Sequence, residues 1–126
     1  MSLSDTFETT TLKWLLTADA VTRPTAWYIG LFTAAPSDAG GGTEVSGGSY
    51  VRKSVAFTVS GNLATNSAAV EFDVATADWG TITDMAVFDA VSGGNMIAYA
   101  TLTAAKTISN GDVFRVPAND LDITMD

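Results

Sequence analysis

The side chains in this sequence that could do chemistry are mainly carboxylates. A pair of carboxylates can hydrolyse a glycosidic bond, and retaining glycosidases hold the two groups about 5 Å apart. Asp84 and Asp89 lie in one extended run, and Asp78 precedes Trp79, an aromatic residue that could stack on a sugar. Their odd spacing places Asp84 and Asp89 on opposite faces of a strand, roughly 17 Å apart. We therefore expect solvated acids at edges or turns, with Trp79 in the core.

Other common catalytic and metal-binding groups are missing, because the chain contains no histidine and no cysteine. Histidine is the commonest general base and transition-metal ligand, and cysteine supplies thiolate nucleophiles and zinc ligands. The glycine run Gly40–Gly42 lacks the lysine and the following Ser or Thr of a phosphate-binding loop. The sequence therefore predicts neither an enzyme nor a cofactor-binding protein.

The composition leaves a calcium site open, because calcium needs only oxygen ligands. Four acids lie in or near predicted loops, namely Asp38, Glu44, Asp112 and Asp122. No segment has the spacing of an EF-hand loop. A structural calcium ion remains an open alternative, without a location.

The charge of the chain bears on its partners. Fourteen acidic residues against six basic ones give a formal net charge of −8. Such a surface repels phosphate backbones, so we expect no nucleic-acid partner. We also expect no membrane partner and no export signal, because there is no apolar run of about 18 residues and no basic start followed by an apolar stretch.

Short runs of β-favouring residues separated by turn residues dominate the chain. The clearest are Thr81–Asp89 and Met96–Leu102, which flank Ser92-Gly93-Gly94-Asn95 and predict a hairpin. Ala26–Phe32 is apolar on both faces and predicts a central strand, in which Gly30 marks a bulge or the close approach of another backbone. Further strands are predicted over Tyr50–Val59, Leu63–Thr65, Ala69–Val74, Val113–Val116 and Leu121–Asp126, with a hairpin turn at Asn110-Gly111. The pattern predicts a mainly β protein, an antiparallel β-sandwich or flattened barrel with one N-terminal α-helix.

The predicted helix covers Ser4 to Leu16, with Ser4 or Asp5 as its cap. Phe7, Thr11, Trp14 and Leu15 recur at helical spacing and form an apolar stripe. Such a helix either covers a sheet edge or the open end of the sandwich, or it packs on a neighbouring subunit. For the second case the candidate interface consists of Phe7, Trp14, Leu15 and Leu16.

We expect a single domain over residues 1–126, with the helix and its lead-in in residues 1–22 and the sandwich in residues 26–126. Within the sandwich range lies a long glycine-rich loop, residues 34–49. Loops of this length are usually functional or flexible. Asp38, Glu44 and Tyr50 are therefore the candidate residues of a binding loop.

Two blocks of the sequence resemble small structural proteins of tailed-bacteriophage virions. These are LFTAAPSDAGGGTEVSGGSYVR, from Leu31 to Arg52, and WGTITDMAVFDAVSGGNMIAYATL, from Trp79 to Leu102. The resemblance spans roughly Ala26 to Thr124. It is to proteins of the tail-fibre-like and capsid-decoration kinds, and it implies a non-enzymatic β-rich protein that assembles by symmetric packing on the particle.

The resemblance implies either a capsid decoration (cement) protein or a component of the tail, neck or fibre. It implies a chain made in the host cytoplasm and located in the virion. The expected partners are other copies of the chain, with a trimer among the expected states, and virion proteins such as the major capsid or tail proteins. The alternative is a carbohydrate-binding module that attaches to the host through Trp79 or residues 34–49.

Overall fold

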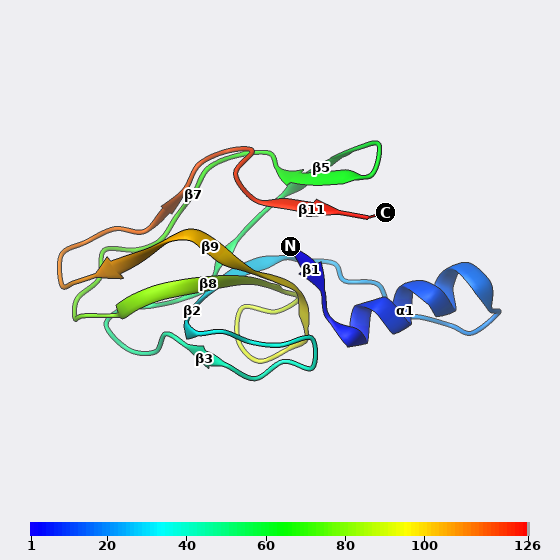
Figure 1. Cartoon of the computed structure of the whole chain (residues 1–126), viewed down its shortest axis with the longest axis horizontal. Helices are drawn as coiled ribbons and strands as arrows, with labels where there is room; N and C mark the ends of the chain where they lie inside the picture. The colour runs from blue at the N-terminus through cyan, green and yellow to red at the C-terminus, as the bar shows by residue number, and fades with distance from the viewer. Residues whose placement is uncertain (126) are drawn as a thin grey trace.

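The computed structural model describes residues 1–125, and the largest element in it is a six-stranded antiparallel sheet. Its strands follow the order β1-β9-β8-β2-β3, and β4 also pairs with β2. They are β1 (Ser2–Leu3), β2 (Tyr28–Ala34), β3 (Thr43–Glu44), β4 (Lys53–Ser54), β8 (Gly80–Phe88) and β9 (Met96–Ile108). The centre of this sheet is the β2, β8, β9 group, in which the predicted hairpin forms β8 and β9 (Figure 1).

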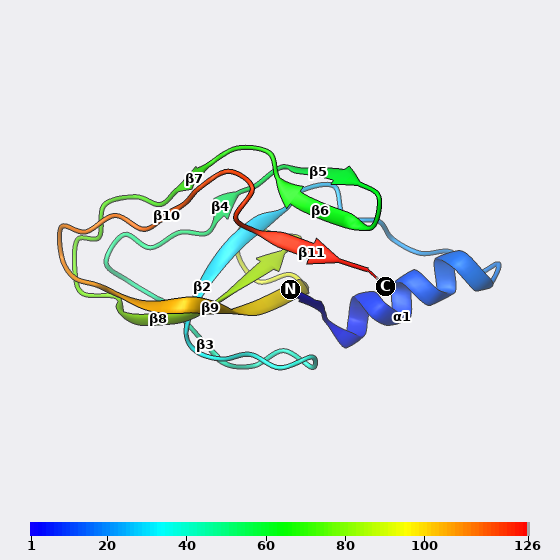
Figure 2. The same ribbon diagram turned by 45° about the horizontal axis from the view of Figure 1, so that its top comes forward.

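Two smaller sheets lie over one face of the large sheet (Figures 1 and 2). One has the order β11-β6-β5, and the other pairs β10 with β7. Their strands are β5 (Phe57–Ser60), β6 (Leu63–Asn66), β7 (Val70–Glu71), β10 (Arg115–Val116) and β11 (Asp122–Thr124). The prediction of a mainly β, antiparallel, sandwich-like fold with one helix is confirmed, and the described residues form no closed barrel.

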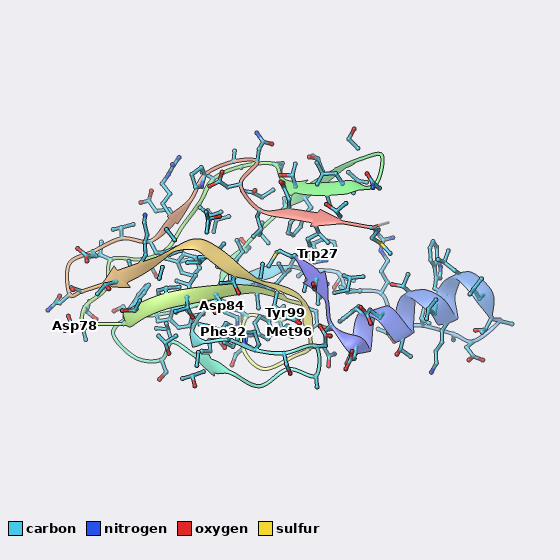
Figure 3. The ribbon with its side chains drawn as sticks, viewed as in Figure 1. Trp27, Phe32, Asp78, Asp84, Met96 and Tyr99 are labelled. Atoms are coloured by element: carbon cyan, nitrogen blue, oxygen red, sulfur yellow. The ribbon has the colours of Figure 1, made fainter. Side chains whose placement is uncertain are left out.

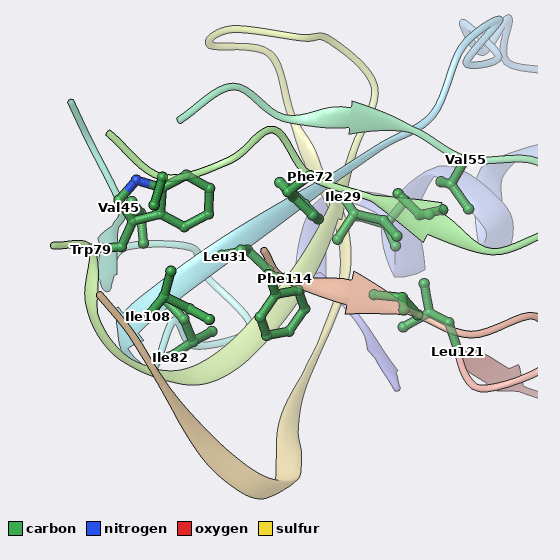
Figure 4. Close-up of a cluster of buried hydrophobic side chains, with 14 residues drawn as sticks. Ile29, Leu31, Val45, Val55, Phe72, Trp79, Ile82, Ile108, Phe114 and Leu121 are labelled. Atoms are coloured by element: carbon green, nitrogen blue, oxygen red, sulfur yellow. The ribbon is translucent and has the colours of Figure 1, made fainter. Parts of the chain in front are cut away.

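The main core fills the space between the two layers (Figure 4). Its buried side chains come from both layers: Ile29, Leu31, Val45, Val55, Val70, Phe72, Ala75, Trp79, Ile82, Val87, Ile108, Phe114, Val116 and Leu121. Trp79 packs edge-on against Tyr50 and Phe72, with ring centroids 5.4 and 6.4 Å apart, and its Nε1–H donates to the Gly48 carbonyl. Trp79 is therefore a core residue, as predicted, because both its apolar ring and its one donor are satisfied inside.

β2 is buried on both faces, as its sequence predicts. Ile29 and Leu31 face the main core, whereas Phe32 joins a second cluster on the other face with Ala86, Phe88 and Met96. Gly30 lies in regular register with Ala86, so no bulge occurs there. A Cβ at Gly30 would lie 2.8 Å from Glu44 Oε2 and 3.0 Å from the Phe88 ring, so the close approach is made by side chains and not by another backbone.

The β8–β9 hairpin is irregular in a way that the sequence did not indicate. Ile82 pairs with Lys106 and Asp84 with Thr101, so β9 advances five residues where β8 advances two. This irregularity places Ile82 in the main core and leaves Ala86 in the second cluster, although both have even numbers. Regular alternation would have put both side chains on one face.

The predicted strand over Tyr50–Val59 is wrong, because the chain changes sheet within it. β4 ends at Ser54 on the large sheet, and β5 begins at Phe57 on a small sheet. One alternation therefore does not describe the segment. Val51 and Val59, which have the same parity, are both exposed, whereas Arg52 between them is buried.

The ends of the other predicted strands also differ from the structure. Ala69–Val74 shortens to β7, and Val74 is exposed. The turn at Asn110-Gly111 exists, with φ of +94° at Gly111, but it does not close a hairpin, because β10 after it pairs with β7 and not with β9. The last predicted strand is β11, and Asp126 lies outside the described residues.

Helix α1 (Asp5–Leu16) has the predicted bounds and is capped by Ser4. Ser4 is itself fixed to the large sheet, since its N–H donates to the Ile97 carbonyl and its hydroxyl to the Met96 carbonyl. From that anchor α1 extends away from the sheets, and the chain then returns to β2 (Figures 1 and 2). None of the α1 residues is buried, so the prediction that the helix covers a sheet edge or the open end of the sandwich is wrong. Among the described residues, no helix has the length and apolar character needed to cross a lipid bilayer.

Candidate functional site

The three carboxylates considered for catalysis are those of Asp78, Asp84 and Asp89. Each accepts hydrogen bonds that connect strands of the sheet or stabilise a turn. Asp84, labelled in Figure 3, lies on β8 and is only 2% exposed. Its two oxygens accept from the hydroxyls of Thr83 at 2.7 Å and Thr101 at 2.9 Å. The expectation of a solvated acid is therefore wrong for Asp84. Asp89 accepts from the backbone and side-chain amides of Asn95, and Asp78 accepts from the backbone N–H of Asn110.

The glycine-rich segment has more structure than its composition suggests. Ser37 and Gly40 form a β-bridge, Thr43–Glu44 forms β3, and Val45 is buried in the main core. At Gly42, where φ is +75°, a Cβ would lie 2.7 Å from the Ala34 carbonyl oxygen. Only glycine fits both this backbone conformation and this space. The segment is therefore a folded loop held against β2.

A largely buried ion pair ties this loop to two other parts of the chain. Arg52 donates through Nε and Nη2 to the two Glu44 oxygens, each at 2.8 Å, in the parallel geometry that suits a guanidinium and a carboxylate. Its Nη1 donates to the carbonyls of Ala90 and Gly93, and its guanidinium lies 3.5 Å from the centroid of the Phe88 ring. We call Glu44, Tyr50 and Arg52 with these partners the clamp.

Tyr50 completes the clamp at the edge of β2. β3 and β4 pair with β2 on either side of Leu31, and the Tyr50 hydroxyl accepts the Leu31 N–H at 2.9 Å in the gap between them. The same hydroxyl donates to Glu44 at 2.6 Å. Burial raises the pKa of the Tyr50 hydroxyl, and the hydrogen bond to the Glu44 carboxylate raises it further. Glu44 and Tyr50 thus direct their polar groups inward.

Asp38, the third residue of the candidate binding loop, lies apart from the clamp. Its carboxylate accepts from the Tyr99 hydroxyl, and its carbonyl accepts from the N–H of Asp5 at the start of α1. The hydrogen bond to Asp38 raises the pKa of Tyr99. Of the other acids weighed for calcium, Asp112 accepts from the backbone N–H of Ser109 and Asp122 lies in β11. Residues 1–125 contain no group of three or more acids placed to hold a metal ion.

The last turns of α1 differ from these loops, because their large apolar side chains are left mostly exposed by the rest of residues 1–125. Leu12, Trp14, Leu15 and Leu16 are 58, 68, 59 and 76% exposed. We call these four residues the helix tip. Fully burying each such side chain is worth about 1.5–3 kcal/mol, so a protein surface that covered them would gain a large part of that free energy. Of the candidate interface, Phe7 is half-buried at the base of α1, whereas the other three residues belong to the tip.

Leu12 is the tip residue that sequence reasoning missed. It lies three residues before Leu15 and four before Leu16, which are neighbour spacings on a helix. The stripe of Phe7, Thr11, Trp14 and Leu15 includes Leu15 but neither Leu12 nor Leu16. The spacing of the leucines was the signal that could have found it.

The family model described as Podophage GP4 fiber I protein gp80 matches residues 2–124. The chain belongs to this family. It is a phage fibre structural protein and thus a virion component, and the resemblance to tail-fibre-like virion proteins is confirmed. A search of curated proteins found no match.

The match to the fibre family covers more of the chain than the two resembling blocks, Leu31–Arg52 and Trp79–Leu102. The match begins before α1 and ends with the last residue of β11. The helix and its exposed tip are therefore part of the fibre-family unit, together with the sandwich.

Proposed function

We propose that this chain is a non-enzymatic building block of a phage tail fibre, and that it is joined to other copies and to neighbouring virion proteins through α1. The observation that carries the proposal is the helix tip, four large apolar side chains that the chain's own sandwich leaves uncovered. Their burial requires another protein surface. Family membership supports a fibre and not a capsid decoration as the place of assembly.

The internal bonding of the other candidate groups supports a structural and not a catalytic role. Asp84 is enclosed between two threonine hydroxyls, and Asp89 is bonded to Asn95. The clamp uses both Glu44 oxygens and the Tyr50 hydroxyl. The polar groups of these loops stabilise the sandwich, and the tip is the part left for partners.

Purified particles test this proposal. We expect mass spectrometry to find the protein in particles and cryo-electron microscopy to place it in a tail fibre. Particles assembled with the Leu12→Glu/Leu16→Glu variant should lose it, while the Val59→Glu variant, which changes an exposed valine on β5, should retain it. Absence of the wild-type protein from purified particles, or retention of the leucine variant, would contradict the proposal.

A further inference from the structure

The junction between β1 and α1 is a single residue. β1 ends at Leu3 and α1 begins at Asp5, so Ser4 alone joins them. The N–H and the hydroxyl of Ser4 are bonded to β9, and its backbone is extended, with φ of −73° and ψ of 157°. A helix of 12 residues is about 18 Å long, so a swing of about 20° around Ser4 would move its far end by about 6 Å. The direction of α1 therefore depends on what else holds its first turn.

The glycine-rich segment supplies a second attachment for this first turn. The Asp5 N–H donates to the Asp38 carbonyl at 3.0 Å. The first amides of a helix have no partner inside the helix, so this bond satisfies one of them from outside. Ser4 satisfies two others, because its carbonyl accepts from the N–H groups of Phe7 and Glu8. The capping of α1 is thus divided between Ser4, which is fixed to β9, and Asp38, which lies far along the chain.

Asp38 is itself held in place from two sides. Its turn is closed by reciprocal backbone hydrogen bonds between Ser37 and Gly40, at 2.9 and 2.8 Å. Its carboxylate accepts from the hydroxyl of Tyr99 on β9. Tyr99 pairs with Ser2 of β1, and its ring packs against the second cluster. Asp38 therefore connects α1, through its carbonyl, to β9, through its carboxylate.

The acids around Tyr99 oppose this arrangement. The hydrogen bond to Asp38 is the main cause of the raised pKa of Tyr99, and the negative charges of Asp38, Asp5 and Glu8 raise the pKa further. The loop and the first turn of α1 thus bring like charges to the same hydroxyl, and like charges repel. The bond from Tyr99 keeps Asp38 beside the helix against this repulsion.

The chain that follows α1 does not replace these attachments. Val21, Arg23 and Pro24 line a groove along the side of the helix. No hydrogen bond within residues 1–125 joins residues 18–27 to α1, so the returning chain lies beside the helix without a polar attachment.

We propose that Asp38 and Tyr99 are positioning residues for α1: with Ser4 they fix the direction of the helix, so that each copy presents its helix tip at one angle to its sandwich. Ser4 alone would leave a pivot, and Asp38 prevents the swing. A binding surface that is held at one angle loses less freedom when it binds, which strengthens assembly. This inference rests on the proposed use of α1 in assembly, and it makes the glycine-rich segment the support of the helix.

Distances between two spin labels test this positioning. The chain has no cysteine, so labels attach only at introduced ones, Leu16→Cys at the end of α1 and Val59→Cys on β5, both at strongly exposed positions. An excess of unlabelled chain restricts the measurement to distances within one copy. We expect one narrow distance distribution in the labelled parent, and a distribution about 6 Å wider when Asp38→Ala or Tyr99→Phe is added, as a swing of about 20° predicts. Asp38→Asn should keep the narrow distribution, because its amide oxygen still accepts from Tyr99.

Thr81→Val is the matched control. It removes another exposed side-chain hydrogen bond of the large sheet, the one between the hydroxyls of Thr81 and Thr107, and it should leave the distribution unchanged. A distribution in Asp38→Ala as narrow as in the parent would overturn the proposal. A wider distribution accompanied by a loss of helical circular dichroism would overturn it as well, because the bonds would then maintain the helix and not its direction.

Occupancy in particles separates this inference from the proposed function. Asp38→Ala should enter the fibre at lower occupancy than Asp38→Asn, since its tips point in different directions. Equal occupancy of these two variants would overturn the need for positioning and leave the proposed function standing. Retention of the Leu12→Glu/Leu16→Glu variant would instead contradict the proposed function, whatever the spin-label distances show.

Discussion

The clamp and the helix tip both belong to segments outside the main core, and they differ in whether their side chains find partners within the same chain. Arg52, the most polar residue of the clamp, is buried and bonded to a carboxylate and two carbonyls. Leu16, the most exposed tip residue, is apolar and 76% exposed. The chain has therefore buried a charge and exposed leucines, which is the reverse of the usual arrangement. The contrast indicates that the polar side chains of the loops find their partners within one copy, whereas the apolar side chains of α1 do not.

Removing the clamp arginine should give the largest loss of stability. We expect Arg52→Met to lower the free energy of unfolding by about 3–5 kcal/mol, because it leaves Glu44 as a largely buried, unpaired carboxylate. Lys53→Met is the matched control. It breaks an exposed pair with Asp73 and should cost less than about 1 kcal/mol. Urea denaturation followed by tryptophan fluorescence measures both, and equal losses would show that the clamp is not structural.

Two neighbouring glycines test whether the loop is folded against β2. Gly41 and Gly42 both have positive φ, but only Gly42 would place a Cβ against backbone atoms. We expect Gly41→Ala to cost about 1–2 kcal/mol through its backbone conformation alone. Gly42→Ala should cost about 1–3 kcal/mol more, because the loop must also move. Thermal unfolding of the two variants side by side measures the difference, and similar losses would mean that the loop is free.

The Tyr50 hydroxyl gives the clamp a pH dependence. Its ordinary pKa is 10.0, and the folded state raises the pKa above that value. As the pH rises through 10, the unfolded chain therefore loses this proton while the folded chain keeps it, so stability is full below pH 10 and falls above it. Tyr50→Phe should weaken that fall and cost about 1–3 kcal/mol at pH 7, since the Leu31 N–H loses its acceptor. Urea midpoints at pH 7 and pH 11 measure both effects, and an identical fall in the variant would exclude Tyr50 as its source.

The tip should show the smallest effect on folding. We expect Leu15→Ser to change the free energy of unfolding of the monomeric chain by less than about 0.5 kcal/mol, because the side chain contacts little of its own molecule. Urea denaturation at a dilution where the chain is monomeric measures this. A loss as large as that of Gly42→Ala would mean that the tip packs on its own sandwich.

The sequence predicts the elements whose pattern is local. The cap at Ser4, the apolar run of β2 and the β8–β9 hairpin each depend on a few neighbouring residues, and all three are present in the structure. The family resemblance likewise rests on contiguous blocks. These features could be predicted because short-range propensity and periodicity agree with the final fold.

The features that could not be predicted depend on contacts far apart in the chain. Asp84 is buried because Thr101, on the next strand, supplies one of its two donors after a five-residue advance in β9. Arg52 is buried because Glu44, Ala90 and Gly93 meet around it. Residue types do not reveal such long-range contacts, and the sequence therefore predicts a solvated acid at Asp84. The helix was recognisable, whereas its lack of cover depended on where the sandwich ends.

The central claim is that the clamp forms within one copy, whereas the helix tip is buried only against another protein copy. Hydrogen exchange of the wild type and the Trp14→Glu variant tests this claim most directly. We predict that amides of residues 12–16 are protected in the wild-type assembly and exchange faster in the variant, while amides of residues 44–52 are equally protected in both. Protection at residues 44–52 that disappears together with that of residues 12–16, or a wild type in which residues 12–16 exchange as fast as in the variant, would contradict the account.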